Sequence, residues 1–239
     1  MSIPSWLEVA VLLPTALVVV AIFAVLWRER RSSRDAAVAI ASGIVLALWA
    51  VTETILARRG FFVQTSGTGV PPIGLNLIAV AVALALSLGA SCSLRRMLRN
   101  QGNLIRLHLW RLEGIVFLVL MIQGHVPALW ALPAGVGDVA VAATAPWVAR
   151  GLDRANGKAR RRATAWTLFG MADLVVAVAL GMMTNPGPAQ VFHTVPTADM
   201  LTQYPLALVP TFLVPLAFTL HVVSLLQLRH ASKEPLPPR

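Results

Sequence analysis

Residues 6–31 read WLEVAVLLPTALVVVAIFAVLWRERR, an apolar run that lies between Trp6 and Trp27 and is followed by arginines. No basic side chain precedes Arg28, whereas Arg30, Arg31 and Arg34 come soon after it. About 20 apolar residues cross the hydrocarbon core of a bilayer as a helix, and basic residues stay on its cytoplasmic side. The order predicts a first membrane helix with the amino terminus outside. A cleavable signal peptide is not expected, because its basic residues would precede the apolar run.

Further apolar runs follow, and the sequence predicts an all-α integral membrane bundle of about seven transmembrane helices. The predicted spans are 7–27, 36–57, 73–94, 107–126, 131–150, 163–183 and 206–228. Hydrophobic residues make up 57% of the chain and charged residues 13%, which is about half the charged fraction of a soluble domain. The connecting segments are too short for a second folded domain. Residues 1–239 are therefore expected to form a single transmembrane domain that ends in a cytoplasmic tail, 229–239.

The basic residues give a second line of support for this topology. Eighteen of the 20 lysines and arginines fall in segments predicted to be cytoplasmic, and only Arg58 and Arg59 fall in outer segments. This bias predicts that the carboxyl terminus lies in the cytoplasm. The net charge is +10, and its basic residues lie at helix ends, where anionic lipid headgroups can neutralise them. The lipid bilayer is therefore the expected partner, and no nucleic-acid partner is expected.

Ionisable side chains inside the spans are the candidate functional residues, because a charge in hydrocarbon is costly. They are Glu53, Glu113, Asp138, Asp173 and His221, with His125 near the outer surface. A rise of about 1.5 Å per residue places Glu53 and His125 outermost, Asp138 deeper, Asp173 near the middle, and Glu113 and His221 in the inner third. If these side chains converge, they form a staircase of proton-exchanging groups; otherwise each only fixes the packing of its helix.

Asp138 and Asp173 are the strongest candidates, because both lie on helix faces made of small residues. The two faces are Ala134, Gly135, Asp138, Ala142 and Ala145 in one span and Gly170, Asp173, Ala177 and Gly181 in the other. Small residues let another helix approach, so both carboxyls are expected to face protein. The strings GVGDVAVA (135–142) and GMADLVVA (170–177) are alike in helices of opposite direction, as in inverted-repeat transporters. No basic residue is predicted at the depth of Asp173, which is therefore expected to be protonated.

Two other spans have distinctive patterns. Small residues recur every four positions in the third span, at Ala81, Ala85, Gly89 and Ser93. This pattern predicts a close-packing face, and a contact for a homo-oligomer or a membrane partner if the face stays exposed. The last span has Pro205, Pro210 and Pro215 before His221, which predicts a bent helix that serves either packing or gating.

No cofactor and no metal are expected. Covalently bound retinal needs a lysine in a span, and neither Lys158 nor Lys233 lies in one. Paired haem ligands must share one depth, whereas His125 and His221 are predicted near opposite sides. Cys92 is the only cysteine, which excludes thiolate zinc. An outer metal site of Glu53, His125, Asp138 and His193 is a weaker alternative, because no pair has helical ligand spacing.

The second half of the chain resembles uncharacterised small multi-span membrane proteins of bacteria. The resemblance rests on the run from Arg111-Leu-Glu113-Gly to Gln123-Gly-His125-Val-Pro127, on Pro133-Ala-Gly-Val-Gly-Asp138, and on the segment 205–221. It implies an inner-membrane bundle and assigns no activity to any residue.

Three hypotheses for the function remain. The leading one is passage of a small solute or protons through the bundle, with Asp138 and Asp173 at its centre, and it predicts a polar cavity that reaches mid-membrane. The second is a non-catalytic membrane subunit or assembly factor, which predicts a dry core and an exposed small-residue face. The third is a membrane enzyme or redox protein, which predicts an outer pocket where Glu53, His125 and Asp138 meet.

Overall fold

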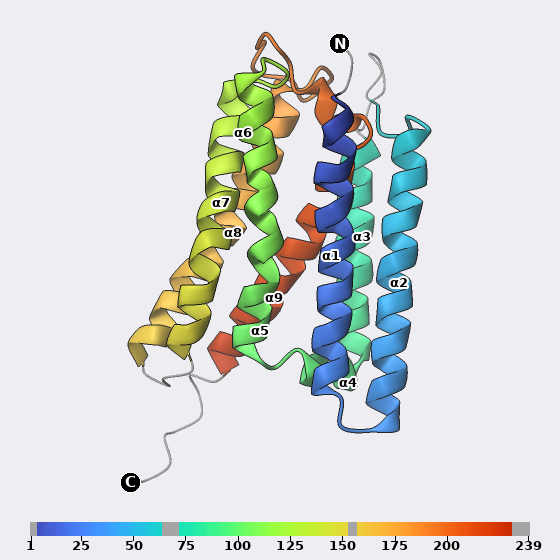
Figure 1. Ribbon diagram of the computed structural model, residues 1–239, viewed down its shortest axis with the longest axis vertical. Helices are drawn as coiled ribbons and strands as arrows, with labels where there is room; N and C mark the ends of the chain where they lie inside the picture. The colour runs from blue at the N-terminus through green and yellow to red at the C-terminus, as the bar shows by residue number, and fades with distance from the viewer. Residues whose placement is uncertain (1–3, 64–71, 153–156, 231–239) are drawn as a thin grey trace.

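The computed structural model describes residues 4–63, 72–152 and 157–230, and these residues form helices joined by turns and loops, with no strand among them (Figure 1). The long helices are α1 Ser5–Glu29, α2 Ser33–Arg58, α3 Pro72–Ala90, α7 Ala128–Leu152, α8 Gly157–Thr184 and α9 Val214–His230. The shorter ones are α4 Cys92–Met97, α5 Gln101–Arg106, η1 Leu107–Glu113, α6 Gly114–Ile122, η2 Asp199–Thr202 and η3 Val209–Leu213. The predicted helical class is confirmed for these residues. Most of the predicted tail lies outside them.

Within the described residues, six helical segments are long and apolar enough to cross a membrane. They are α1, α2, α3, α7, most of α8, and a segment that joins η3 to α9, Val209–Arg229. The fourth predicted span, 107–126, begins with the seven-residue 3₁₀ segment η1 and continues as α6, and α5 precedes η1 to complete a composite of two α-helices around it. Figure 1 shows this composite, α5–η1–α6, running beside α7.

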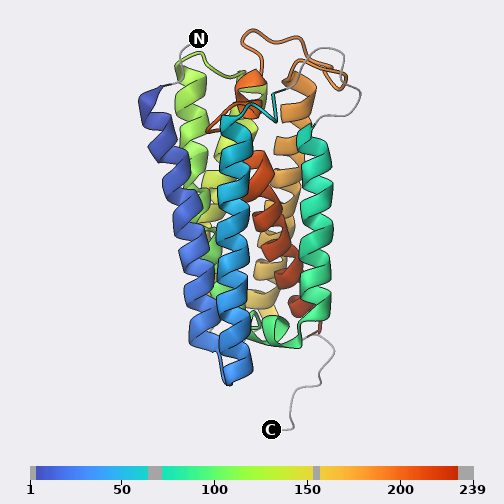
Figure 2. The same ribbon diagram turned by 90° about the vertical axis from the view of Figure 1, so that its right-hand side faces the viewer.

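The helices form an elongated bundle around α9 (Figures 1 and 2). On one side α6, α7 and α8 pack together, and on the other α1 packs on α2, with α3 nearby. Helix α9 crosses obliquely between the two groups and contacts α8, α5 and α3. The amino terminus lies at the same end of the bundle as the α6–α7 turn and the loop 185–208, here termed the amino-terminal end.

The outer surface of the bundle is largely apolar. Exposed aliphatic side chains recur along the long helices, including Val9, Leu17, Leu48, Leu86 and Val175. Soluble monomers rarely expose continuous apolar surface of this kind, so the pattern is that of helices that face lipid.

Helix α3 packs least of all the long helices, since none of its residues is buried. Ala81, Ala85 and Gly89 are exposed, whereas Ser93 is buried in α4. The close packing that this face predicts is therefore not made within the described chain.

The helix ahead of α9 also departs from α geometry. Residues Val209–Leu213 form a π-helical turn that includes Pro210, where proline removes a backbone donor. The last span was predicted to bend at its prolines, and the described structure has a π-helical turn at one of them. Both irregular segments, η1 and η3, border the cluster and the pocket described next.

Candidate functional site

A buried arginine joins four helical segments at the centre of one side of the bundle. Arg111 of η1 has no exposed side-chain surface, and its Nε donates to Asp138 Oδ1 of α7 at 2.5 Å. Its Nη2 donates to Asp173 Oδ2 of α8, and its Nη1 lies 3.2 Å from His221 Nε2 of α9. These four residues are termed the Arg111 cluster. Every side-chain nitrogen of the guanidinium thus faces an acceptor from a different helix.

Glycines make this approach possible. A methyl group on Gly137 would meet the Asp173 carboxylate, and one on Gly114 would lie 2.6 Å from Asp138 Cβ. Gly135 and Gly114 meet backbone to backbone, so α6 and α7 touch without side chains between them. The small-residue faces that the sequence predicts for α7 and α8 are therefore the surfaces on which the cluster assembles.

The histidine of the cluster belongs to an aromatic stack. The ring of His221 stacks on His108 of η1, with centroids 3.9 Å apart, and Trp166 of α8 packs against both rings. A guanidinium only donates hydrogen bonds, so His221 Nε2 accepts and its proton is on Nδ1. That Nδ1 and His108 Nδ1 are buried without a hydrogen-bond partner.

Glu113 adds a third acid beside the cluster. It is 6% exposed, lies within electrostatic reach of Asp138, and neither of its carboxyl oxygens has a hydrogen-bond partner. The region therefore holds three carboxyls and one guanidinium, which pairs with Asp138 and Asp173, while the acceptor role of His221 keeps the imidazole neutral. Since uncompensated buried charge is strongly unfavourable, the group needs two protons or other cations to reach neutrality.

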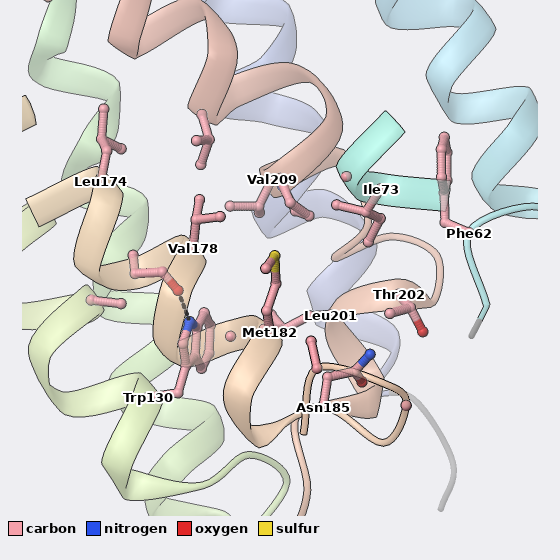
Figure 3. A pocket seen from close by; sticks show the side chains of 18 of the residues that line it. Phe62, Ile73, Trp130, Leu174, Val178, Met182, Asn185, Leu201, Thr202 and Val209 are labelled. Atoms are coloured by element: carbon pink, nitrogen blue, oxygen red, sulfur yellow. Dashed lines mark hydrogen bonds between the residues drawn. The ribbon is translucent and has the colours of Figure 1, made fainter. Parts of the chain in front are cut away.

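An apolar pocket leads from the amino-terminal end of the bundle to Asp138. Its volume is about 90 Å³, and its wall includes Trp130, Leu174, Val178 and Met182 (Figure 3). Asp138 keeps 14% of its side chain exposed and is the ionisable member of the described wall. The transport hypothesis predicts a polar cavity that reaches mid-membrane, whereas this pocket has a mostly apolar wall and reaches Asp138 alone among the predicted acids.

Two of the six sequence candidates lie apart from the cluster. Glu53 of α2 is buried and accepts a hydrogen bond from Trp49 Nε1 at 3.1 Å, next to Asn76 and Thr211. His125, in the turn before α7, is half-buried, and its Nδ1 has no hydrogen-bond partner. The structure thus brings together Asp138, Asp173, Glu113 and His221, but it places neither Glu53 nor His125 with them.

The expectation that no basic residue reaches Asp173 is wrong, because Arg111 pairs with it directly. The charge pattern assigns Arg111 to the cytoplasmic segment 95–111, as the last of five basic residues. A signal was present in the hairpin: Arg111 lies 14 residues before His125, and Asp138 lies 13 residues after it. Residues equally far from a tight helical turn lie at a similar height in the two helices, so this spacing is compatible with an ion pair. His108 lies in the same segment, 95–111, and was therefore not predicted as a candidate.

The outer enzyme or metal site has no geometric support. No group of three or more histidine, cysteine or acidic side chains within the described ranges could hold a metal ion. Glu53, His125 and Asp138 make no hydrogen bond with one another in those ranges.

A separate group of hydrogen-bonded polar side chains lies at the amino-terminal end of the bundle. Arg58 Nη2 donates to Glu8 Oε1 at 2.6 Å and to Tyr204 Oη at 2.8 Å, and Tyr204 Oη donates to the same Glu8 oxygen at 2.6 Å. Partial burial, reinforced by the hydrogen bond to Glu8, raises the pKa of Tyr204 above 10.0. This group ties α1, α2 and the loop before η3 together.

The fold and the site define a helical bundle with apolar outer surfaces and an internal arginine–carboxylate cluster. The chain belongs to a family defined by a domain of unknown function, DUF8737, whose model matches residues 70–229. The matched range includes the whole Arg111 cluster and begins after α1 and α2. No curated protein and no solved structure matches the chain.

Proposed function

We propose that the protein is a multi-pass membrane protein that moves a small solute or protons across the inner (plasma) membrane, with Asp138 and Asp173 at its centre. The observation that carries the proposal is the position of the Arg111 cluster at the floor of a pocket, where Asp138 remains partly exposed. A purely structural ion pair needs no cavity beside it.

In this proposal the composite α5–η1–α6 also crosses the membrane, and it brings the number of spans from six to seven. The amino-terminal end of the bundle then faces outward and the carboxyl terminus faces the cytoplasm. Treating the composite as a span moves Arg106 and Arg111 out of the cytoplasmic segment and leaves 16 inner basic residues against the two outer ones, so the charge bias is preserved.

The chemistry follows from the charge balance of the cluster. Asp138 and Asp173 share one guanidinium and Glu113 lies within electrostatic reach of Asp138, so protons that reach Asp138 through the pocket can be held and released there. When Asp138 is protonated, the neighbouring carboxylate of Asp173 still pairs with the Arg111 guanidinium. A proton can thus be exchanged without leaving Arg111 unpaired in a low-dielectric interior.

The test is proton flux in liposomes that contain the parent protein, Asp173→Asn or Asp199→Asn. Asp199 lies in the loop at the amino-terminal end and bonds Thr197 and Gln203, so its variant is the matched control. We expect flux in the parent and the control, and at least a tenfold loss in Asp173→Asn with insertion and thermal stability retained. Unchanged flux in a well-folded Asp173→Asn protein, or no flux in the parent, would contradict the proposal.

A non-catalytic membrane subunit or assembly factor is the second candidate, and the exposed α3 favours it. In that case α3 covers its small-residue face with a second copy or another membrane protein. Light scattering of the detergent-solubilised protein, compared with Ala85→Trp, tests the first arrangement. A parent that is monomeric at all concentrations excludes a homo-oligomer through α3.

A further inference from the structure

The pocket that ends at Asp138 presents a carboxyl group to a ligand, whereas the positive charge of Arg111 is buried behind it. Arg111 has no exposed side-chain surface and is not part of the wall, because its nitrogens are directed at Asp138, Asp173 and His221. Asp138 uses Oδ1 for Arg111 and retains exposed surface toward the pocket. An anion would therefore meet the Asp138 carboxyl without reaching the guanidinium, whereas a cation can replace the proton of that carboxyl and pair with it.

The rest of the wall favours an organic cation over a metal ion. Trp130 Nε1 donates to Ala177 O at 3.1 Å, so the indole nitrogen is already satisfied and the ring contributes apolar surface (Figure 3). Phe117 packs 5.0 Å from Trp130, centroid to centroid, and also lines the pocket. Aromatic faces attract ammonium groups, and apolar walls stabilise a hydrocarbon body. A bare metal ion would need several oxygen ligands, which the described wall does not supply.

The other end of the pocket also offers an acceptor. Asn185 lines the pocket where α8 ends, and its Oδ1 is buried without a hydrogen-bond partner. Thr202 lines it as well, but its hydroxyl already donates to Asp199 O at 2.8 Å. Pockets in which apolar and aromatic side chains surround a few polar groups are typical binding sites for small molecules.

We propose that this pocket binds a small organic ammonium ion with an apolar body, whose charged nitrogen pairs with the exposed side of Asp138. The inference rests on the proposed transport function and names its substrate class. When the cation is absent, Asp138 holds a proton; when one cation enters, the carboxyl releases that proton to solvent. The charge of the cluster is unchanged by the exchange, so one ammonium ion moves against one proton.

The test uses three probes of similar size: benzylammonium, benzyl alcohol and benzoate. Calorimetry on the detergent-solubilised protein measures their affinity, and the same titration in two buffers of different ionisation enthalpy measures protons released. We expect benzylammonium to bind at least tenfold more tightly than benzyl alcohol, benzoate not to bind, and about one proton to leave per cation when Asp138 is initially protonated. The apparent affinity for benzylammonium rises with pH until Asp138 is deprotonated without ligand.

Variants distinguish the contribution of the Asp138 carboxylate to binding from the contribution of the shape of the pocket. Asp138→Asn should lose the preference for benzylammonium over benzyl alcohol, whereas Asp199→Asn should retain it. Val178→Phe fills the pocket and leaves every carboxyl in place, so it should weaken both probes even if Asp138→Asn fails to fold. Equal affinity for the alcohol and the ammonium ion in the parent, or binding without proton release across the pH range, would overturn the inference.

The outcome is distinguishable from that of the proposed function. Proton flux in liposomes without benzylammonium binding refutes the substrate class and leaves the transport proposal standing. Benzylammonium binding without uptake into liposomes that carry a proton gradient refutes transport and leaves a binding site.

Discussion

The imidazole of His221 occupies the space that a methyl group on Gly170 would fill. An ideal Cβ at Gly170 would lie 2.5 Å from His221 Cε1 and 3.3 Å from Arg111 Nη1. Helices α8 and α9 therefore meet at this level with a ring packed directly on backbone, and the position of His221 against Arg111 depends on a missing side chain.

Gly170→Ala should therefore displace His221 and destabilise the protein by about 1–3 kcal/mol, as overpacking does in other cores. The control is Gly89→Ala, because a methyl group at Gly89 meets no atom within 4 Å and should be neutral or stabilise helix α3 by up to about 1 kcal/mol. Thermal unfolding in detergent measures both variants. A Gly170→Ala protein as stable as the parent would contradict this packing.

Removing the positive charge of the cluster should be more damaging. Arg111→Gln leaves Asp138 and Asp173 without their common partner, and breaking a buried pair in this way costs about 3–5 kcal/mol. Arg99→Gln changes an exposed arginine and should shift stability by less than about 0.5 kcal/mol. The triple variant Arg111→Gln/Asp138→Asn/Asp173→Asn removes the unpaired charges and should regain much of the loss. No recovery in the triple variant would show that the charges are not the cause.

Tyr204 is the only tyrosine, so its ionisation can be followed by ultraviolet absorbance without interference from another tyrosine. Burial and the hydrogen bond to Glu8 raise its pKa above 10.0 in the folded protein, and we expect a midpoint above that of the denatured chain. The unfolded state loses its proton first as the pH rises. The stabilising contribution of Tyr204 is therefore complete below pH 10.0 and is lost as the pH rises through the folded pKa. Glu8→Gln should lower the midpoint, and identical midpoints for folded and denatured protein would contradict the hydrogen-bonded geometry.

The proposed topology predicts the side on which each loop lies. Reporters fused after Arg34, Arg99, Arg162 and the carboxyl terminus should report cytoplasm, and those after Thr65 and Pro196 should report the outside. Thr65 lies outside the described residues, whereas Pro196 belongs to the loop at the amino-terminal end. A cytoplasmic signal from Pro196 would rule out the seven-span arrangement.

The helical class was predictable because it depends on the hydrophobic composition and on the length of the apolar runs, and both can be read directly from the sequence. The faces of Asp138 and Asp173 were predictable too, since small residues at helical spacing mark close packing. Arg111 was not, because a charge-counting rule assigns an arginine near a helix end to water and ignores the partner that could hold it inside. The exposure of α3 could not be foreseen, because a small-residue face is the same in sequence whether it meets its own chain or not.

The short turn between α6 and α7 has a consequence for how the chain is made. Arg111 and Asp138 lie at nearly equal distances from the turn at Gly124, whose φ is 72°, and they pair across the hairpin. On translocon-based scales, a lone arginine at the centre of a membrane helix costs about 3 kcal/mol, as does a lone aspartate. Segments joined so tightly can leave the translocation channel as one unit, with the two charges already neutralising each other. Biosynthesis of this half of the protein therefore does not require either residue to enter lipid as an unpaired ion.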